Sequence, residues 1–128
     1  MTIVPIQNKD SLYFYRAIVK DVYDGDTITV DIDFGMKHWL MGVKTRIAYI
    51  QAPEVRGEGK EEGFKSREYL KNLLFGKEII IKTLKDKTGK FGRLLIEIYL
   101  DGEYINGKLV TEGFAKNYPG MDVLLRTM

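Results

Sequence analysis

Apolar and polar positions alternate through the first third of the chain, a pattern typical of antiparallel strands. From Leu12 to Phe34 the chain predicts a hairpin, and the apolar residues of its second half share one face: Ile28, Val30, Ile32 and Phe34. Between the two strands lies Tyr23–Asp26, "YDGD". A tight turn or bulge is expected there, because Gly25 is free to adopt a positive φ.

The next apolar run, Trp39–Ile50, predicts a third strand that is buried on both faces. Trp39 and Tyr49 are accordingly expected to be core residues, and His38 to be an exposed turn residue. Pro53 ends this strand, and the glycine-rich segment that follows predicts an open loop.

Helical spacing replaces alternation after this loop. One apolar stripe with a small residue at its start repeats at i, i+3, i+4, i+7 and i+8: Ser66, Tyr69, Leu70, Leu73 and Leu74. Gly76 is the expected stop. Two more strands are predicted at 77–85 and 91–100, joined by a turn with Gly89 in a left-handed conformation. A short helix through Leu109 and Val110 would end at Gly113.

The order of three strands, helix, two strands and helix fits the OB-fold, a five-stranded Greek-key barrel. The expected class is α+β, mainly β. We expect an N-terminal arm at 1–10, one barrel domain at 11–118 and a C-terminal tail at 119–128. A chain of 128 residues suits a single core.

Composition restricts the chemistry. The chain has no cysteine and one histidine, His38, so disulfides, thiolate sites and histidine-based zinc sites are excluded. A bound metal would need oxygen ligands, which favours calcium, magnesium or manganese. No apolar run is long enough to span a bilayer. The first ten residues lack the features of an export signal, so the expected location is cytoplasmic, or secreted if a leader has been removed.

The net charge of +2 is too small to indicate nucleic-acid binding by itself. Positive charge does gather in the segment 82–93, which could be either a binding surface or a solvated loop. The paired carboxylates of Asp24 and Asp26 repel each other, so a metal ion, an arginine or water is expected beside them.

Three more charged residues stand out. Arg46 lies within an apolar strand, Glu54 follows Pro53, and Arg93 lies at the start of the last strand. A buried arginine needs a partner. Either the arginines simply pair with acidic side chains, or two guanidiniums and two carboxylates converge on one phosphate and one metal. The second arrangement would stabilise the charge that develops during phosphodiester hydrolysis.

Four motifs together resemble the staphylococcal nuclease-like (thermonuclease) domains, from about Tyr15 to Tyr118. They are "VYDGDT", "RIAYIQAPE", "KFGR" and "NGKLVTEGFAKNY". The second is similar to the family pattern Arg-Leu-x-x-Ile-Asp-x-Pro-Glu, and the fourth to Asn-x-x-Leu-Val-x-x-Gly-x-Ala. The resemblance implies an OB-fold, calcium binding, and cleavage of DNA and RNA that leaves 3′-phosphates.

The resemblance also implies residue roles. Asp26 would bind calcium directly, Asp24 would lie in an outer shell, and Ala52 would offer its backbone carbonyl. Glu54 would lie near the metal and hold the attacking water, and Arg46 and Arg93 would clamp the phosphate. Residues expected to contact nucleic acid are Lys87, Lys90 and Phe91.

Two departures from the family pattern matter. Gln51 stands where the family has a second ligand aspartate, so a weakened calcium site is expected, with magnesium or manganese as alternatives. A third helix usual in the family would be truncated or absent after Tyr118. The expected activity is a nuclease with low sequence specificity. The alternatives are a non-catalytic OB-fold module that binds nucleic acid or a protein, and a purely structural barrel. The expected partners are DNA and/or RNA, with no membrane, and the expected state is a monomer or weak homodimer.

Overall fold

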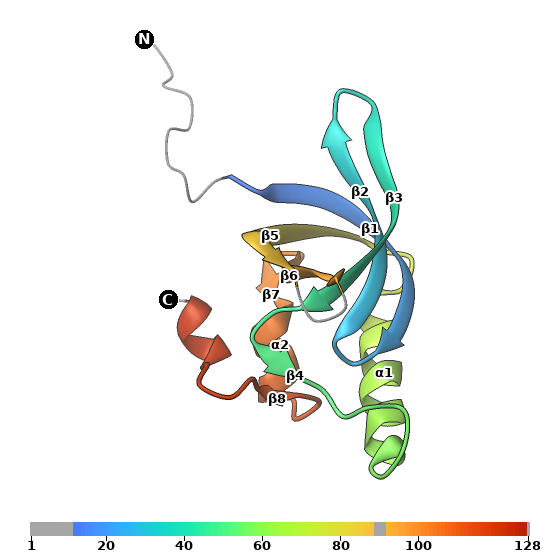
Figure 1. The fold of residues 1–128 in the computed structure, drawn as a ribbon, viewed down its shortest axis with the longest axis vertical. Helices are drawn as coiled ribbons and strands as arrows, with labels where there is room; N and C mark the ends of the chain where they lie inside the picture. The colour runs from blue at the N-terminus through green and yellow to red at the C-terminus, as the bar shows by residue number, and fades with distance from the viewer. Residues whose placement is uncertain (1–11, 89–91, 128) are drawn as a thin grey trace.

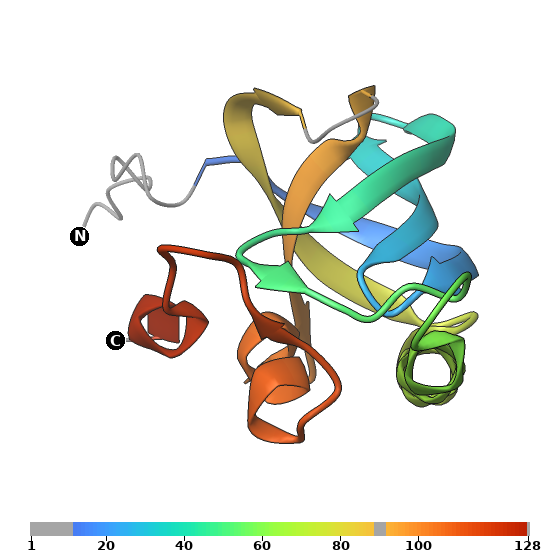
Figure 2. The same ribbon diagram turned by 60° about the horizontal axis from the view of Figure 1, so that its bottom comes forward.

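The computed structural model describes residues 12–88 and 92–127, and its centre is a closed β-barrel (Figures 1 and 2). Its strands are β1 (Phe14–Asp24), β2 (Thr27–Gly35), β3 (His38–Ile47), β5 (Glu78–Thr88) and β6 (Leu94–Leu100). They pair in the order β3-β2-β1-β5-β6, and β3 closes the barrel by pairing in parallel with β6. The predicted OB-fold is confirmed.

Short elements complete the fold. The two-stranded pair β4 (Ile50–Gln51) and β8 (Lys116–Asn117) lies beside the barrel, and β7 (Glu103–Tyr104) extends its sheet. The helices are α1 (Lys60–Leu74) and α2 (Ile105–Thr111), and η3 (Val123–Thr127) is a turn of 3₁₀-helix. Among the described residues, none of the helices is long and apolar enough to cross a membrane.

The barrel interior is filled by the alternating apolar residues of its strands, and α1 covers one end. As the spacing predicts, α1 buries Ser66, Leu70 and Leu74, while Tyr69 and Leu73 are partly buried against the core. The helix ends where expected, since Gly76 has φ +74°. Val123 of the tail is fully buried and belongs to the same core.

The prediction for the third strand is wrong in its first half. Residues 38–42 are exposed, and Trp39 keeps 42% of its surface in solvent. The physical reason is that β3 pairs with β6 only at Thr45–Ile47. The first half of β3 therefore pairs with β2 alone, as one arm of a hairpin that extends past the barrel (Figure 1). Phe34, predicted to share one apolar face with Ile28, Val30 and Ile32, is exposed at the same end, whereas those three residues are buried.

The same strand is also shorter than predicted. It ends at Ile47, and a turn at Ala48–Tyr49 separates it from β4. Tyr49 adopts φ +71° and packs against the core while only partly buried. At the other predicted turn, β5 continues to Thr88, and Gly89 lies outside the described residues.

Candidate metal and phosphate site

The turn between β1 and β2 holds Asp24 and Asp26 against helix α1. Gly25 does not take the positive φ that the sequence suggested; its role is steric. A Cβ at this position would overlap the hydroxyl oxygen of Ser66 and lie 2.7 Å from the Cβ of Ala52. Ser66 is itself fixed by donating to the carbonyl of Phe114 at 2.7 Å. Only glycine therefore lets the turn pack between α1 and the segment that follows β4.

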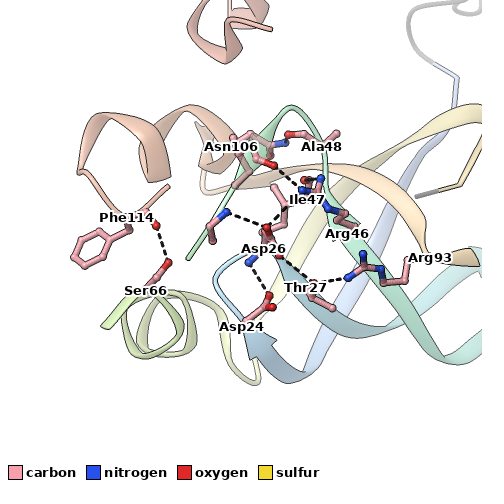
Figure 3. A network of polar contacts seen from close by, with 12 residues as sticks. Asp24, Asp26, Thr27, Arg46, Ile47, Ala48, Ser66, Arg93, Asn106 and Phe114 are labelled. Carbon is pink, nitrogen blue, oxygen red and sulfur yellow. Dashed lines mark hydrogen bonds and ion pairs between the residues drawn. The ribbon is translucent and has the colours of Figure 1, made fainter. Parts of the chain in front are cut away.

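Asp26 is the centre of the polar network in Figure 3 and is only 7% exposed. One carboxylate oxygen accepts the backbone N–H of Ala52 at 2.9 Å, and the other accepts the hydroxyl of Thr27 at 3.1 Å. Its backbone carbonyl accepts the N–H of Ile47 at 2.8 Å. These contacts tie the turn to the end of β3 and to the segment after β4.

Arg46 reaches the same carboxylate from β3. Its side chain is 14% exposed, and Nη2 lies 3.5 Å from Oδ2 of Asp26. The guanidinium donates to the carbonyls of Ile47 and Ile50 at 3.3 and 3.0 Å and lies 5.5 Å from the ring centre of Tyr118. The two hydrogen bonds use two of its five N–H donors.

Arg93 approaches from the segment just before β6. Its Nη1 donates to the hydroxyl of Thr27 at 3.0 Å. Thr27 is paired with Arg46 across β2 and β3, and Arg46 with Leu95 across β3 and β6. Strand register thus brings both arginines to one end of the barrel (Figure 3). The alternative in which the arginines only pair with acidic side chains is observed in part, because Arg46 pairs with Asp26.

Gln51 and Glu54 are exposed beside this network. Gln51 is paired with Lys116 in the β4–β8 sheet. Glu54 lies in the loop that follows, where its carbonyl packs so closely on Gly63 of α1 that a Cβ there would overlap it. Within residues 12–88 and 92–127, the side chains of Gln51 and Glu54 form no hydrogen bond or ion pair with Asp26, Arg46 or Arg93. The convergence of Gln51 and Glu54 on these residues therefore stays a prediction.

The residues expected to contact nucleic acid fall in the least described part of the chain. Lys90 and Phe91 lie outside the described residues. Lys87 belongs to β5, but the position of its side chain is not described either. Their roles therefore remain expectations from the resemblance.

The surroundings of the turn disfavour the charged form of Asp24. Burial, followed by the hydrogen-bonding and repulsive effects of the neighbouring Asp26 carboxylate, raises the pKa of Asp24 from 3.8 to about 6. The hydrogen bond that the Asp26 N–H donates to Asp24 at 3.1 Å offsets this only in part. A cation bound here would relieve the repulsion.

The residues at this turn fit a weak site for a hard cation. Carboxylate, amide and carbonyl oxygens are the ligands that calcium prefers, and Asp24, Asp26, Gln51 and the Ala52 carbonyl would supply them. Within the described part of the chain, however, no cluster contains three or more acidic, histidine or cysteine residues suited to a metal. The two neighbouring carboxylates of Asp24 and Asp26 support the fit, while the small number of charges limits the affinity.

Asn106 helps to hold the elements around the site together. It belongs to one of the sequence motifs, but the motif did not reveal this role. This buried side chain donates to the carbonyl of Ala48 at 3.0 Å and accepts the N–H of Ile98 at 2.8 Å. It thereby ties α2 and β6 to the turn that follows β3. Tyr118, which the sequence marked only as the end of the domain, lies beside Arg46. Sequence spacing gave no signal for either contact.

Comparison with known proteins agrees with this geometry. Residues 44–123 match the sequence family described as "Staphylococcal nuclease homologue". The chain belongs to this family. It is also 32% identical over 96 residues to a protein named thermonuclease from Staphylococcus hyicus, and 32% identical over 108 residues to one from Staphylococcus intermedius. These matches cover 74% and 82% of this chain but 54% and 62% of the relatives. The chain thus spans somewhat more than half the length of either thermonuclease.

Proposed function

We propose that this member of the staphylococcal nuclease homologue family hydrolyses phosphodiester bonds in DNA and/or RNA with low sequence specificity, depends on calcium, and leaves 3′-phosphates. The observation that carries the proposal is the meeting of Arg46 and Arg93 at the Asp26–Thr27 turn. The names of the two thermonuclease relatives support it.

The arginines bind and orient the scissile phosphate. Arg46 and Arg93 each offer a planar fork of N–H donors that matches the oxygens of a phosphate. Both are already held at the same end of the barrel, so they need little rearrangement as charge develops on the phosphate oxygens. Tyr118 and the carbonyls of Ile47 and Ile50 keep Arg46 in place.

Asp26, Gln51 and the Ala52 carbonyl would hold a calcium ion, with Asp24 slightly further out and Glu54 nearby. When bound, the ion would supply positive charge to the phosphate in the transition state. The hydrogen bond from the Ala52 N–H holds Asp26 in a fixed orientation toward this segment.

Glu54 orients the attacking water and accepts its proton. This role needs a carboxylate that stays accessible to water, and Glu54 is exposed. The close contact of its backbone with Gly63 fixes the base of the loop that carries it.

The direct experiment is cleavage of single-stranded DNA and of RNA with calcium, with magnesium or manganese, and with EDTA. We expect cleavage with calcium, none with EDTA, and products that a 3′-phosphatase can dephosphorylate. Products bearing 5′-phosphates would contradict the proposed chemistry.

A non-catalytic module that binds nucleic acid or a protein partner is the second candidate. Two observations favour it: Gln51 is neutral where the family has an aspartate, and Arg46 is paired with Asp26 in the structure. Binding of labelled single-stranded DNA without cleavage under every metal condition would support this candidate over the nuclease.

A further inference from the structure

The far end of the β2–β3 hairpin carries a group of exposed apolar side chains, which we call the hairpin tip: Phe34, Met36, Trp39, Leu40 and Met41. Figure 1 shows this end of the hairpin extending past the barrel. Met36 is 89% exposed and Met41 65%, and the other three lie between 42% and 47%. Adjacent apolar side chains exposed in this number are typical of an interaction site.

Local turn chemistry does not explain the apolar apex. Met36 and Lys37 have φ values of +54° and +64°, and the flanking residues Gly35 and His38 are paired. This is the geometry of a type I′ turn, whose two central positions usually hold asparagine and glycine. A methionine in a left-handed conformation with its side chain in water is disfavoured twice, which points to a use for that side chain.

Apolar side chains are exposed on both faces of the hairpin at this end, and not on one face alone. Successive residues of a strand point to opposite sides, and Trp39, Leu40 and Met41 are all exposed. A flat docking partner would cover only one of these sides. A medium that encloses the tip, such as the interfacial region of a lipid bilayer, would cover both.

The charges of the hairpin suit an anionic surface. The two carboxylates of the hairpin are buried or half-buried and already paired. Oδ2 of Asp31 lies 3.7 Å from Nζ of Lys20, and Oδ2 of Asp33 lies 2.7 Å from Nη2 of Arg16. Lys37 at the apex is exposed. The tip therefore presents apolar side chains together with the Lys37 cation, the combination that binds interfaces containing anionic lipids.

We propose that the hairpin tip inserts into the headgroup region of membranes that contain anionic lipids. This differs from the expectation of no membrane partner, which rested on the absence of a spanning segment. Met36, Leu40 and Met41 would enter the acyl boundary, Trp39 would lie at the interface, and Lys37 would contact lipid phosphates. The proposal stands independently of the proposed nuclease activity.

The geometry leaves the candidate site accessible. Thr27 begins β2 at the site, and Gly35 ends it at the tip. A nine-residue strand of this kind is roughly 30 Å long. A membrane-bound molecule would thus hold Asp26 and Arg46 well away from the lipid surface.

The chain contains one tryptophan, Trp39, which makes its fluorescence a direct test. The full chain is titrated with vesicles of phosphatidylcholine alone and with vesicles that also contain phosphatidylserine. We expect a blue shift of the emission with the anionic vesicles, quenching by lipids brominated along the acyl chain, and weaker binding in high salt. Replacing both Met36→Asp and Met41→Asp should raise the lipid concentration for half-maximal binding at least about tenfold.

Met121→Asp is the matched control, because Met121 is also exposed, at 42%, but lies in the tail. It should bind vesicles like the parent. No binding to anionic vesicles, or binding without a blue shift, would overturn the proposal. A blue shift that depends on protein concentration without lipid would assign the tip to a second copy of the chain, and one caused only by oligonucleotide would assign it to nucleic acid.

Discussion

At the scale of single residues, several groups of the site bind the same carboxylate, that of Asp26. Asp26 is shared between the Ala52 N–H, the Thr27 hydroxyl and Arg46. The sequence predicted that a positive partner would lie near the paired aspartates, and Arg46 is one. It could not rank an arginine against a metal, because the choice depends on three-dimensional distances between strands.

The raised pKa of Asp24 predicts how the metal-free protein responds to pH. A carboxyl group with a folded-state pKa of about 6, against an ordinary 3.8, stabilises the fold fully below the lower value. That contribution is lost as the pH rises through about 6. Asp24→Asn should therefore stabilise the metal-free protein at pH 8 by about 1–2 kcal/mol, a figure reduced because the side chain is only half-buried.

Urea unfolding in EDTA at pH 4 and pH 8 measures this effect. The gain from Asp24→Asn should be much smaller at pH 4, because the Asp24 carboxyl is already mostly protonated in the fold there. The asparagine keeps the oxygen that accepts the Asp26 N–H at both pH values. Asp21→Asn is the control, because Asp21 is exposed on the same strand and its carboxylate also accepts a backbone N–H. An equal gain at both pH values would refute the assigned cause.

At the scale of elements, alternation and helical spacing predicted the strands and helices of the barrel well. They failed where exposure depends on how far a strand extends past its neighbours. The apolar residues Trp39–Met41 read as a buried strand, yet β6 does not reach them. The role of Gly25 was also misassigned, because sequence shows that a glycine is present but not which side chain lies against it.

The contact between α1 and the Glu54 loop predicts an unusual sign for a helix substitution. Glycine to alanine inside a helix ordinarily stabilises by up to about 1 kcal/mol. Gly63→Ala should instead destabilise by about 1–3 kcal/mol, because the added Cβ overlaps the carbonyl oxygen of Glu54. Thermal or urea unfolding checks this, with Lys65→Ala on the exposed face of α1 as the control. A stabilised Gly63→Ala would show that the loop is not held as described.

At the scale of the whole molecule, the small net charge makes nucleic-acid binding depend on local clusters. The triple variant Lys85→Ala, Lys87→Ala and Lys90→Ala should flatten the plot of log K against log salt for single-stranded DNA. Each lost phosphate contact is worth about 0.7 of the slope. Lys65→Ala is the control, because Lys65 is exposed on α1, outside the segment 82–93. An unchanged slope for the triple variant would mark the cluster as a solvated loop.

The most direct test of the central claim is a calcium titration of DNA cleavage by the parent chain, Gln51→Asp and Arg46→Ala, with Arg46→Lys as the charge-conserving comparison. Gln51→Asp should lower the calcium concentration for half-maximal activity about ten- to a hundredfold, because it adds a second charged ligand. Arg46→Ala should slow cleavage by about 10³-fold, because Arg46 acts on the phosphate in the transition state. It should not weaken calcium binding, because Arg46 pairs with Asp26 in the metal-free protein and its removal leaves that carboxylate to the metal. If the parent and Gln51→Asp both remain folded and inactive at every calcium concentration, the catalytic account is wrong.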